Sequence, residues 1–228
     1  MSLDLNTLPI IFLASTLGRS DLEDVASELG YPFNLERISG DGIVRGSFYT
    51  FQRKMEQFVE HKVGKPIDSE DITRCFGEGE DPVSAIIYNC LTRKQRVPVD
   101  AFLRAMEEEI KQTHKDYPDC NSIILEGFPS PKYVDSIELA EKLIRMNLPE
   151  GSYFFMVYAP NHEGYKNFYE NIRPVLSATY GMTKDLNYSP GTQLDEICSE
   201  AIQTLTMTPE WIGVVDHEKA SFRTHVPI

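Results

Sequence analysis

Three uninterrupted apolar runs constrain the fold of this chain more than any other feature of its sequence. They lie within residues 9–14, 121–126 and 152–158, and the middle of each run contains only apolar side chains. Strands buried on both faces of a parallel sheet have this composition, whereas half-exposed strands alternate between apolar and polar residues. Each run therefore predicts an interior strand of a parallel sheet.

Segments with the pattern of amphipathic helices separate these runs. We expect helices over residues 20–30, 48–63, 82–95, 98–114, 132–146, 164–180 and 192–205, and further short strands at 32–35 and 185–188. A chain that alternates strands and helices in this way folds into a parallel sheet with helices on both faces. The predicted fold class is α/β, with a five-stranded parallel sheet.

The charge balance and the cysteines narrow the classes of partner and the compartment. A net charge of −13 opposes binding to nucleic acid and to anionic membranes. The four cysteines, at positions 75, 90, 120 and 198, form no C-x-x-C pair, which favours a reduced, cytoplasmic protein over a zinc protein. The first apolar run has no Lys or Arg before it, so we interpret it as a strand and not as a signal peptide. No run is long enough to span a membrane, so we expect no membrane partner.

Acidic residues stand at two places where a ligand could bind. Glu126 ends the second apolar run and Gly127 follows it, which places both at the edge where parallel sheets bind ligands. Two interpretations of Glu126 remain open: its carboxylate faces a ligand, or it caps the next turn. The acidic loop at 76–82 is either a solvated turn, which we favour, or a metal site.

Several short segments, taken in order, point to a known family. Residues 38–45 read Ile-Ser-Gly-Asp-Gly-Ile-Val-Arg, and residues 123–129 read Ile-Ile-Leu-Glu-Gly-Phe-Pro. They resemble S-T-G-D-L-L-R and I-L-D-G-F-P-R of the nucleoside monophosphate kinases, which include adenylate kinase and UMP-CMP kinase. Further similar segments are 10–13, 18–20, 29–32, 96–100, 154–160 and 173–181. The resemblance covers about residues 9–206.

This resemblance implies a fold and a domain organisation. It implies a P-loop-type fold with three layers, helix, sheet and helix, over residues 1–208. A helical insertion at about 46–97 would stand on the side that binds the phosphate acceptor. Residues 209–228 would form a C-terminal extension, which contains Trp211 and which we interpret as an edge strand or a docking segment.

The resemblance also implies a phosphate loop at the end of the first strand. Gly18, Arg19 and Ser20 fall in it, with Arg19 at the position of the lysine that reaches the phosphates of ATP. Gly18 alone remains of the glycines that let backbone N–H groups surround a phosphate. Ser20 and Glu23 have the spacing of a capping box, so self-capping of this helix is the competing interpretation.

The acceptor side of the family's site is kept only in part. Ser39, Asp41 and Arg45 match the segment that holds the acceptor nucleotide, but Arg45 stands one residue further from Asp41 than in the family. Arg45 therefore holds a monophosphate or is an ordinary surface arginine. Ser130 replaces the arginine that grips the acceptor phosphate as a bidentate fork. Residues 159–166 stand where the family has its lid and contain no arginine.

Two further roles come from the resemblance alone. Glu126 matches the acid that orders the hydration shell of Mg²⁺, and Gly127 matches the glycine that lets the chain approach the acceptor. If the chain is active, the resemblance implies ATP and Mg²⁺ as cofactors.

Three hypotheses about function remain. We favour a catalytically impaired kinase-like protein that binds a nucleotide or a protein partner, because phosphoryl transfer depends on charge neutralisation that this sequence has lost. The second is an active, divergent kinase that transfers phosphoryl from ATP to AMP, UMP or CMP. It would use Arg19 at the donor, Glu126 for magnesium and Arg45 at the acceptor. The third is a different chemistry in the same cleft.

Overall fold

The fold was analysed in a computed structural model of the chain. The residues that the structure describes are 9–15, 19–78, 82–128, 133–146, 148–158, 170–172, 174–175, 183–187 and 194–212. Within these ranges, no helix is both long enough and apolar enough to cross a membrane.

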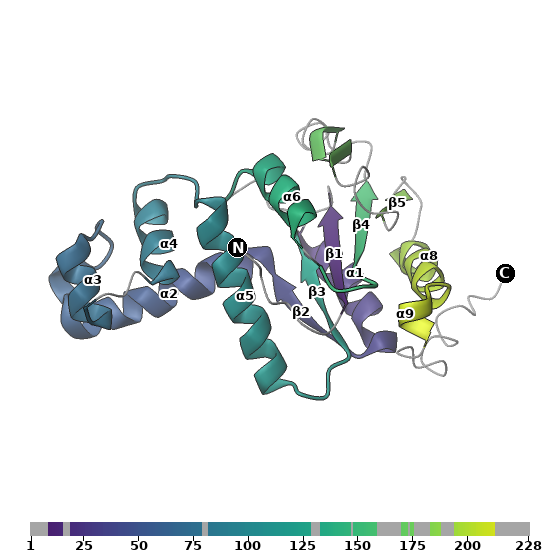
Figure 1. The fold of residues 1–228 in the computed structure, drawn as a ribbon, viewed down its shortest axis with the longest axis horizontal. Helices are drawn as coiled ribbons and strands as arrows, with labels where there is room; N and C mark the ends of the chain where they lie inside the picture. Colours follow the sequence, from purple (N-terminus) through teal and green to yellow (C-terminus); the bar gives the residue numbers. More distant parts are fainter. Residues whose placement is uncertain are drawn as a thin grey trace.

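The strands form one parallel sheet whose middle strand is β1 (Ile10–Ser15). The strand order is β2-β3-β1-β4-β5, and every pairing is parallel (Figure 1). The other strands are β2 (Leu35–Ser39), β3 (Ser122–Glu126), β4 (Tyr153–Tyr158) and β5 (Thr183–Asn187). The predicted α/β class with a parallel sheet is confirmed.

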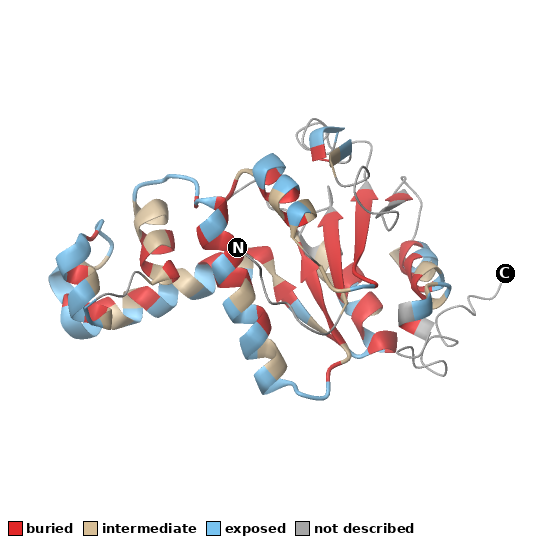
Figure 2. Cartoon of the chain, in the orientation of Figure 1, coloured by how far each residue is buried: buried red, intermediate tan, exposed pale blue. Residues whose placement is uncertain are grey.

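The continuous apolar runs are explained by burial on both faces of the sheet. Phe12 of β1 belongs to one hydrophobic cluster, whereas its neighbours Ile11 and Leu13 belong to the cluster on the opposite face. Successive side chains of a strand point to opposite faces, so a strand covered on both sides must be apolar at every position. Figure 2 shows β1, β3 and β4 as buried along their lengths.

Different helices cover the two faces. One cluster contains residues of α1 (Arg19–Phe33), α8 (Leu194–Thr206) and α9 (Pro209–Ile212). The other contains residues of α5 (Val99–Asp116), α6 (Ser136–Arg145) and the first turns of α2 (Gly40–Phe58). The sheet therefore lies between two layers of helix, and its carboxyl edge remains the place where loops meet.

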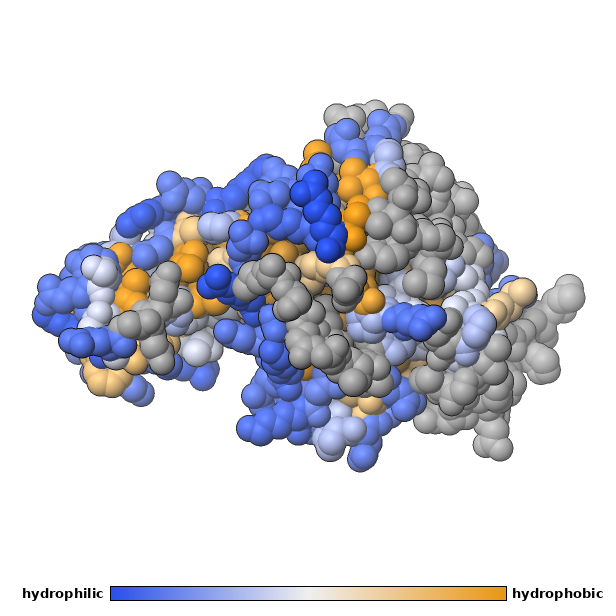
Figure 3. All heavy atoms as spheres, viewed as in Figure 1, coloured by the Kyte–Doolittle hydropathy of each residue, from blue (hydrophilic) through white to orange (hydrophobic). Residues whose placement is uncertain are grey.

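The far half of α2 extends away from the sheet together with η1 (Glu60–Lys62), α3 (Ser69–Phe76) and α4 (Val83–Thr92) (Figure 1). We call this group the arm. It has a cluster built around Phe51, Met55 and Tyr88, while Val83 and Ile87 of α4 pack in the sheet cluster that contains α5 and α6. In Figure 3, apolar side chains also reach the surface over the arm. The arm occupies the stretch where the insertion at 46–97 is expected, and the domain limits stay a prediction.

A buried carboxylate fixes the geometry of the arm. Asp68 and Asp71 form a capping box at the start of α3, in which each side chain accepts a hydrogen bond from the other residue's backbone N–H. The ammonium of Lys62 lies 2.7 Å from an oxygen of Asp71, which is buried. The hydrogen bond to Asp71 raises the pKa of Lys62, because it favours the charged form.

Several predicted element limits are wrong. The strand expected at 32–35 is instead Leu35–Ser39, because Pro32 and Phe33 complete α1 and Asn34 turns the chain with φ of 53°. The helix expected at 48–63 begins earlier, at Gly40, directly after β2. The helix expected at 132–146 begins only at Ser136. Its cap is the Asp135 side chain, which accepts hydrogen bonds from the backbone N–H groups of Ile137 and Glu138. Most of the helix expected at 164–180 lies outside the described residues.

Trp211 is neither in an edge strand nor in an exposed docking segment. It lies in α9, is fully buried, and donates from its indole nitrogen to the carbonyl oxygen of Gly151 at 2.8 Å. Its ring meets Phe33 of α1 edge-on, with 5.5 Å between ring centroids. The start of the predicted extension is therefore part of the main core, while residues 213–228 lie outside the described part of the chain.

We expect Trp211→Ala to lower the free energy of unfolding by about 3–5 kcal/mol, because it removes a buried aromatic side chain and leaves a cavity. Urea unfolding followed by far-UV circular dichroism measures this. Met207→Ala is the matched control, since its side chain is 76% exposed, and its change should stay within about 0.5 kcal/mol. Equal effects of the two substitutions would contradict the packing described for α9.

Candidate functional site

The connections of the sheet single out the carboxyl ends of β1 and β3. The chain passes from β1 to β2 in one direction across the sheet and from β3 to β4 in the other, so the direction of the connections reverses between β1 and β3. Ligands of open α/β sheets bind beyond the carboxyl ends of strands at such a reversal. Leu13 of β1 is in register with Glu126 of β3, which brings Glu126 to this carboxyl edge.

Glu126 is a buried charge with an internal cation beside it. It is the last residue of β3 and only 5% exposed, and the guanidinium of Arg37 donates from Nη2 to its Oε2 at 2.9 Å. Arg37 lies on β2, where it pairs in register with Ile124. Residues two apart on a strand share a face, so Arg37 and Glu126 are diagonal neighbours on the face that α1 covers. The carboxylate is therefore neutralised within the protein.

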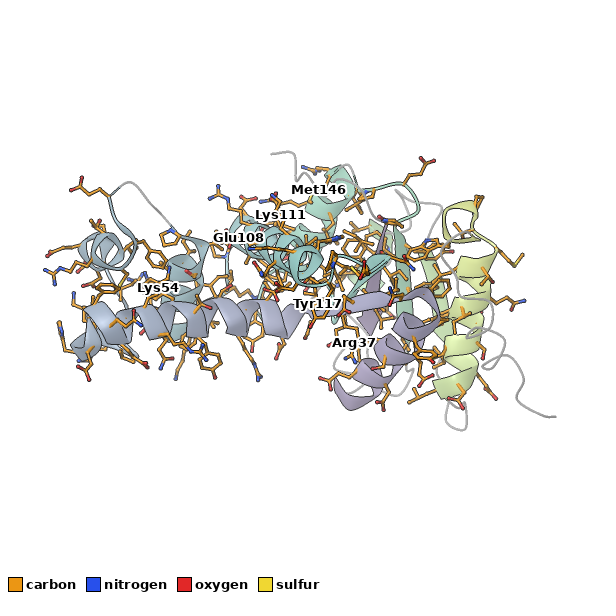
Figure 4. All side chains as sticks on the ribbon, turned by 90° about the horizontal axis from the view of Figure 1, so that it is seen from below. Arg37, Lys54, Glu108, Lys111, Tyr117 and Met146 are labelled. Carbon is orange, nitrogen blue, oxygen red and sulfur yellow. The ribbon has the colours of Figure 1, made fainter. Side chains whose placement is uncertain are left out.

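The same arginine also contacts the helix above it. Its Nη1 donates to the hydroxyl of Ser27 in α1, so one planar guanidinium joins β2, β3 and α1. Figure 4 shows Arg37 beside α1, far from Lys54, which lies in the arm. A guanidinium has several donors in fixed directions, and this geometry lets it bridge a carboxylate and a hydroxyl at once.

Gly127 is required by the backbone. It has φ of 68°, a left-handed conformation that side chains other than glycine rarely adopt. Its N–H donates to the carbonyl oxygen of Leu13 at 3.0 Å, which turns the chain back over β1 directly after Glu126. Among the described residues, a Cβ on Gly127 would meet only a Leu22 methyl group at 3.7 Å, so these neighbours leave the conformation as what limits the position. Its approach to an acceptor nucleotide stays a prediction.

Arg45 is engaged by neighbours on the acceptor side. It forms an ion pair at 3.1 Å with Asp41, one turn earlier in α2, and a hydrogen bond with Tyr133 from the segment after β3. The hydrogen bond with Tyr133 and then the charge of Asp41 raise the pKa of Arg45. Its side chain is still 49% exposed. Ser39 ends β2 and precedes α2, but its hydroxyl does not cap that helix.

The described residues bring together only part of the predicted site. Glu126, Gly127, Ser39, Asp41 and Arg45 all follow or end β2 and β3, at the same edge of the sheet. Arg19 and Ser20 open α1, directly after the carboxyl end of β1, and their side chains lie outside the description. Gly18 and Ser130 also lie outside the described residues. The donor half of the prediction is therefore untested.

Arg37 is the residue of the candidate site that the sequence interpretation missed. The misplaced strand at 32–35 left Arg37 in a connection, where an arginine carries no structural meaning. A strand placed correctly at Leu35–Ser39 would have put Arg37 two residues before the carboxyl edge, beside a strand that ends in an acid. That signal is available only once the register of β2 against β3 is known.

The described residues do not fit a resident Mg²⁺ ion at Glu126. Mg²⁺ is usually held by one or two carboxylates together with substrate phosphates. Here the guanidinium of Arg37 lies 2.9 Å from the carboxylate and would repel a dication. Among the described residues, no group of three or more His, Cys, Asp or Glu side chains could hold a metal ion. Residues 79–81 of the acidic loop at 76–82 lie outside the described part, so its two interpretations stay open.

We expect Gly127→Ala to destabilise the protein by about 1–2 kcal/mol, because alanine is strained in the left-handed conformation. Gly46→Ala is the matched control. Gly46 lies inside α2, and a Cβ there would have no heavy atom of the described residues within 4 Å, so alanine should stabilise the protein by up to about 1 kcal/mol. The two shifts, measured as urea unfolding midpoints, should have opposite signs, and shifts of the same sign would refute this account of the turn.

A scan against protein-family models and a search of curated proteins both found no match for this chain. The similarity to nucleoside monophosphate kinases therefore remains a prediction from short sequence motifs.

Proposed function

We propose that this protein is a nucleoside monophosphate kinase-like binding module in which phosphoryl transfer is impaired. The observation that carries the proposal is the ion pair between Arg37 and Glu126. In the proposed relationship, Glu126 occupies the position of the acid that orders the hydration shell of Mg²⁺. An acid already neutralised by an internal arginine is poorly placed to do this.

The stability of the ion pair supports the proposal. A hydrogen bond to a charged group contributes about 1.5–3 kcal/mol, and a third of the Arg37 side chain is exposed, so the lower end applies here. Glu126 is buried, and a buried carboxylate that loses its partner destabilises the fold. The charge of Glu126 thus contributes to holding β2, β3 and α1 together. A metal ion would have to displace a partner that the fold already uses.

The positions where the family has phosphate-binding arginines also support impaired phosphoryl transfer. Ser130 stands where the family has an arginine, and Arg45 is already paired with Asp41 and hydrogen-bonded to Tyr133. Phosphoryl transfer depends almost wholly on positioning and on neutralising the charge of the transferring group. Loss of one such donor typically lowers the rate by about 10²–10³-fold. Losses at several positions together support an impaired catalyst.

Binding of a nucleoside phosphate survives these losses more easily than catalysis does. Arg37 and Arg45 come from β2 and the start of α2, and both are partly exposed beside the carboxyl edge. They supply positive charge against a net charge of −13 for the whole chain. A P-loop-type arrangement would place the start of α1 at the same edge. A protein partner at this edge is the second class of ligand that the proposal includes.

The proposal predicts that purified protein mixed with ATP, Mg²⁺ and AMP, UMP or CMP forms no diphosphate above background. The turnover number should stay below about 0.01 per second, at least about 10⁴-fold below an efficient kinase of this type. Coupled detection of the diphosphate measures this directly.

The control is the Arg19→Ala variant, purified in the same way, because a contaminating kinase would act equally in both preparations. Turnover that is present in the natural chain and lost in this variant would overturn the proposal. The chain would then be the active, divergent kinase that uses Arg19 at the donor phosphates.

A further inference from the structure

We propose that Arg37 takes the place of a divalent cation at Glu126, so that the ligand of the carboxyl edge is a metal-free nucleoside phosphate. This inference rests on the proposed nucleotide-binding function, but it concerns a separate property, the identity of the counter-charge. It predicts that Mg²⁺ does not assist binding, whereas kinases of the resembled family act on a magnesium complex of the nucleotide.

The ion pair of Arg37 and Glu126 stands out by its position in the sheet. Among the ion pairs of the described residues, only two include a buried carboxylate, Arg37–Glu126 and Lys62–Asp71. The second belongs to the arm, where Asp71 completes the capping box of α3. The first stands at the end of β3, beside β1, where the direction of the connections reverses. The hydrogen bond that the Glu126 carboxylate accepts here comes from a side chain of the neighbouring strand.

The geometry of the Arg37 guanidinium lets it contact more than one partner. Two of its nitrogens are directed at different partners, Nη2 at Glu126 and Nη1 at Ser27, and the side chain is 33% exposed. A planar guanidinium carries five N–H donors, and it binds phosphate oxygens as readily as carboxylates. Arg37 can therefore neutralise Glu126 and present positive charge to an anion at the same edge, which is what a bound cation would do.

The charges of Arg37 and Glu126 favour an anion over a metal ion at this edge. The pair of Arg37 and Glu126 is neutral, so the charge of the buried Glu126 carboxylate does not repel an incoming anion. A dication at the same place would stand next to the fixed positive charge of Arg37, which cannot be lost by deprotonation. Removing the charge of Arg37 should open Glu126 to a metal ion, since Mg²⁺ and Mn²⁺ both favour carboxylate oxygens.

The test titrates Mn²⁺ alone into the full chain and follows free Mn²⁺ by electron paramagnetic resonance. The natural chain should bind Mn²⁺ at Glu126 at most weakly, and Arg37→Gln should bind one Mn²⁺ ion there at least about tenfold more tightly than the natural chain does. The double variant Arg37→Gln with Glu126→Gln should lose that site again. Arg74→Gln is the matched control, because it also removes one positive charge from an ion pair, with exposed Glu70 in the arm, and should gain nothing.

Each outcome of the titration decides the role of Arg37. An equally strong Mn²⁺ site in the natural chain that Glu126→Gln abolishes would overturn the inference. So would a folded Arg37→Gln variant, checked by circular dichroism, that gains no site.

A second measurement on the natural chain applies even if Arg37→Gln does not fold. Calorimetric titration with ADP is carried out in EDTA and again in excess Mg²⁺. Binding should be as strong in EDTA, and tenfold stronger binding with Mg²⁺ would overturn the inference. No binding of ADP in either buffer would refute the proposed nucleotide binding, while the Mn²⁺ titration would still decide what Arg37 does.

Discussion

The structure depends on the middle strand of its sheet, β1. β1 pairs with β3 along one edge and with β4 along the other, and it contributes side chains to both hydrophobic clusters. Each fully buried aliphatic or aromatic side chain contributes about 1.5–3 kcal/mol to stability, so the side chains of β1 help to anchor both helical layers. The position of β1 also determines where the loops meet, because the carboxyl ends of parallel strands all open at the same edge.

The ion pair of Arg37 and Glu126 stabilises the fold at the carboxyl edge, where the candidate site lies. A carboxylate at the end of a buried strand needs a partner, and the neighbouring strand supplies one in a diagonal position. The partner then ties the edge strand β2 to α1 through Ser27. The charge of Glu126 could assist chemistry in a catalytic site, but here it is paired with Arg37 and stabilises the fold. The proposed loss of catalysis follows from this pairing.

The sequence predicted the interior strands well because their physical signal is simple. Runs at 9–14, 121–126 and 152–158 lie within one residue of β1, β3 and β4, since burial on both faces demands continuous apolar residues. β2 carried no such signal, because Glu36, Arg37 and Ser39 interrupt it, and only its pairing with β3 defines it as a strand. For the same reason, only part of the candidate site could be predicted from the sequence. Glu126 stood out in sequence, whereas its partner depends on register between segments far apart in the chain.

The chain contains a single tryptophan, and its location makes it an optical probe of one half of the molecule. Trp211 is packed against Phe33 and the carbonyl of Gly151, in the layer formed by α1, α8 and α9. The cluster of the arm contains Tyr88 and Phe51 instead. Intrinsic tryptophan emission therefore reports on that layer of the sheet domain. Unfolding of the arm alone would lower the helical circular dichroism and leave the emission spectrum almost unaltered.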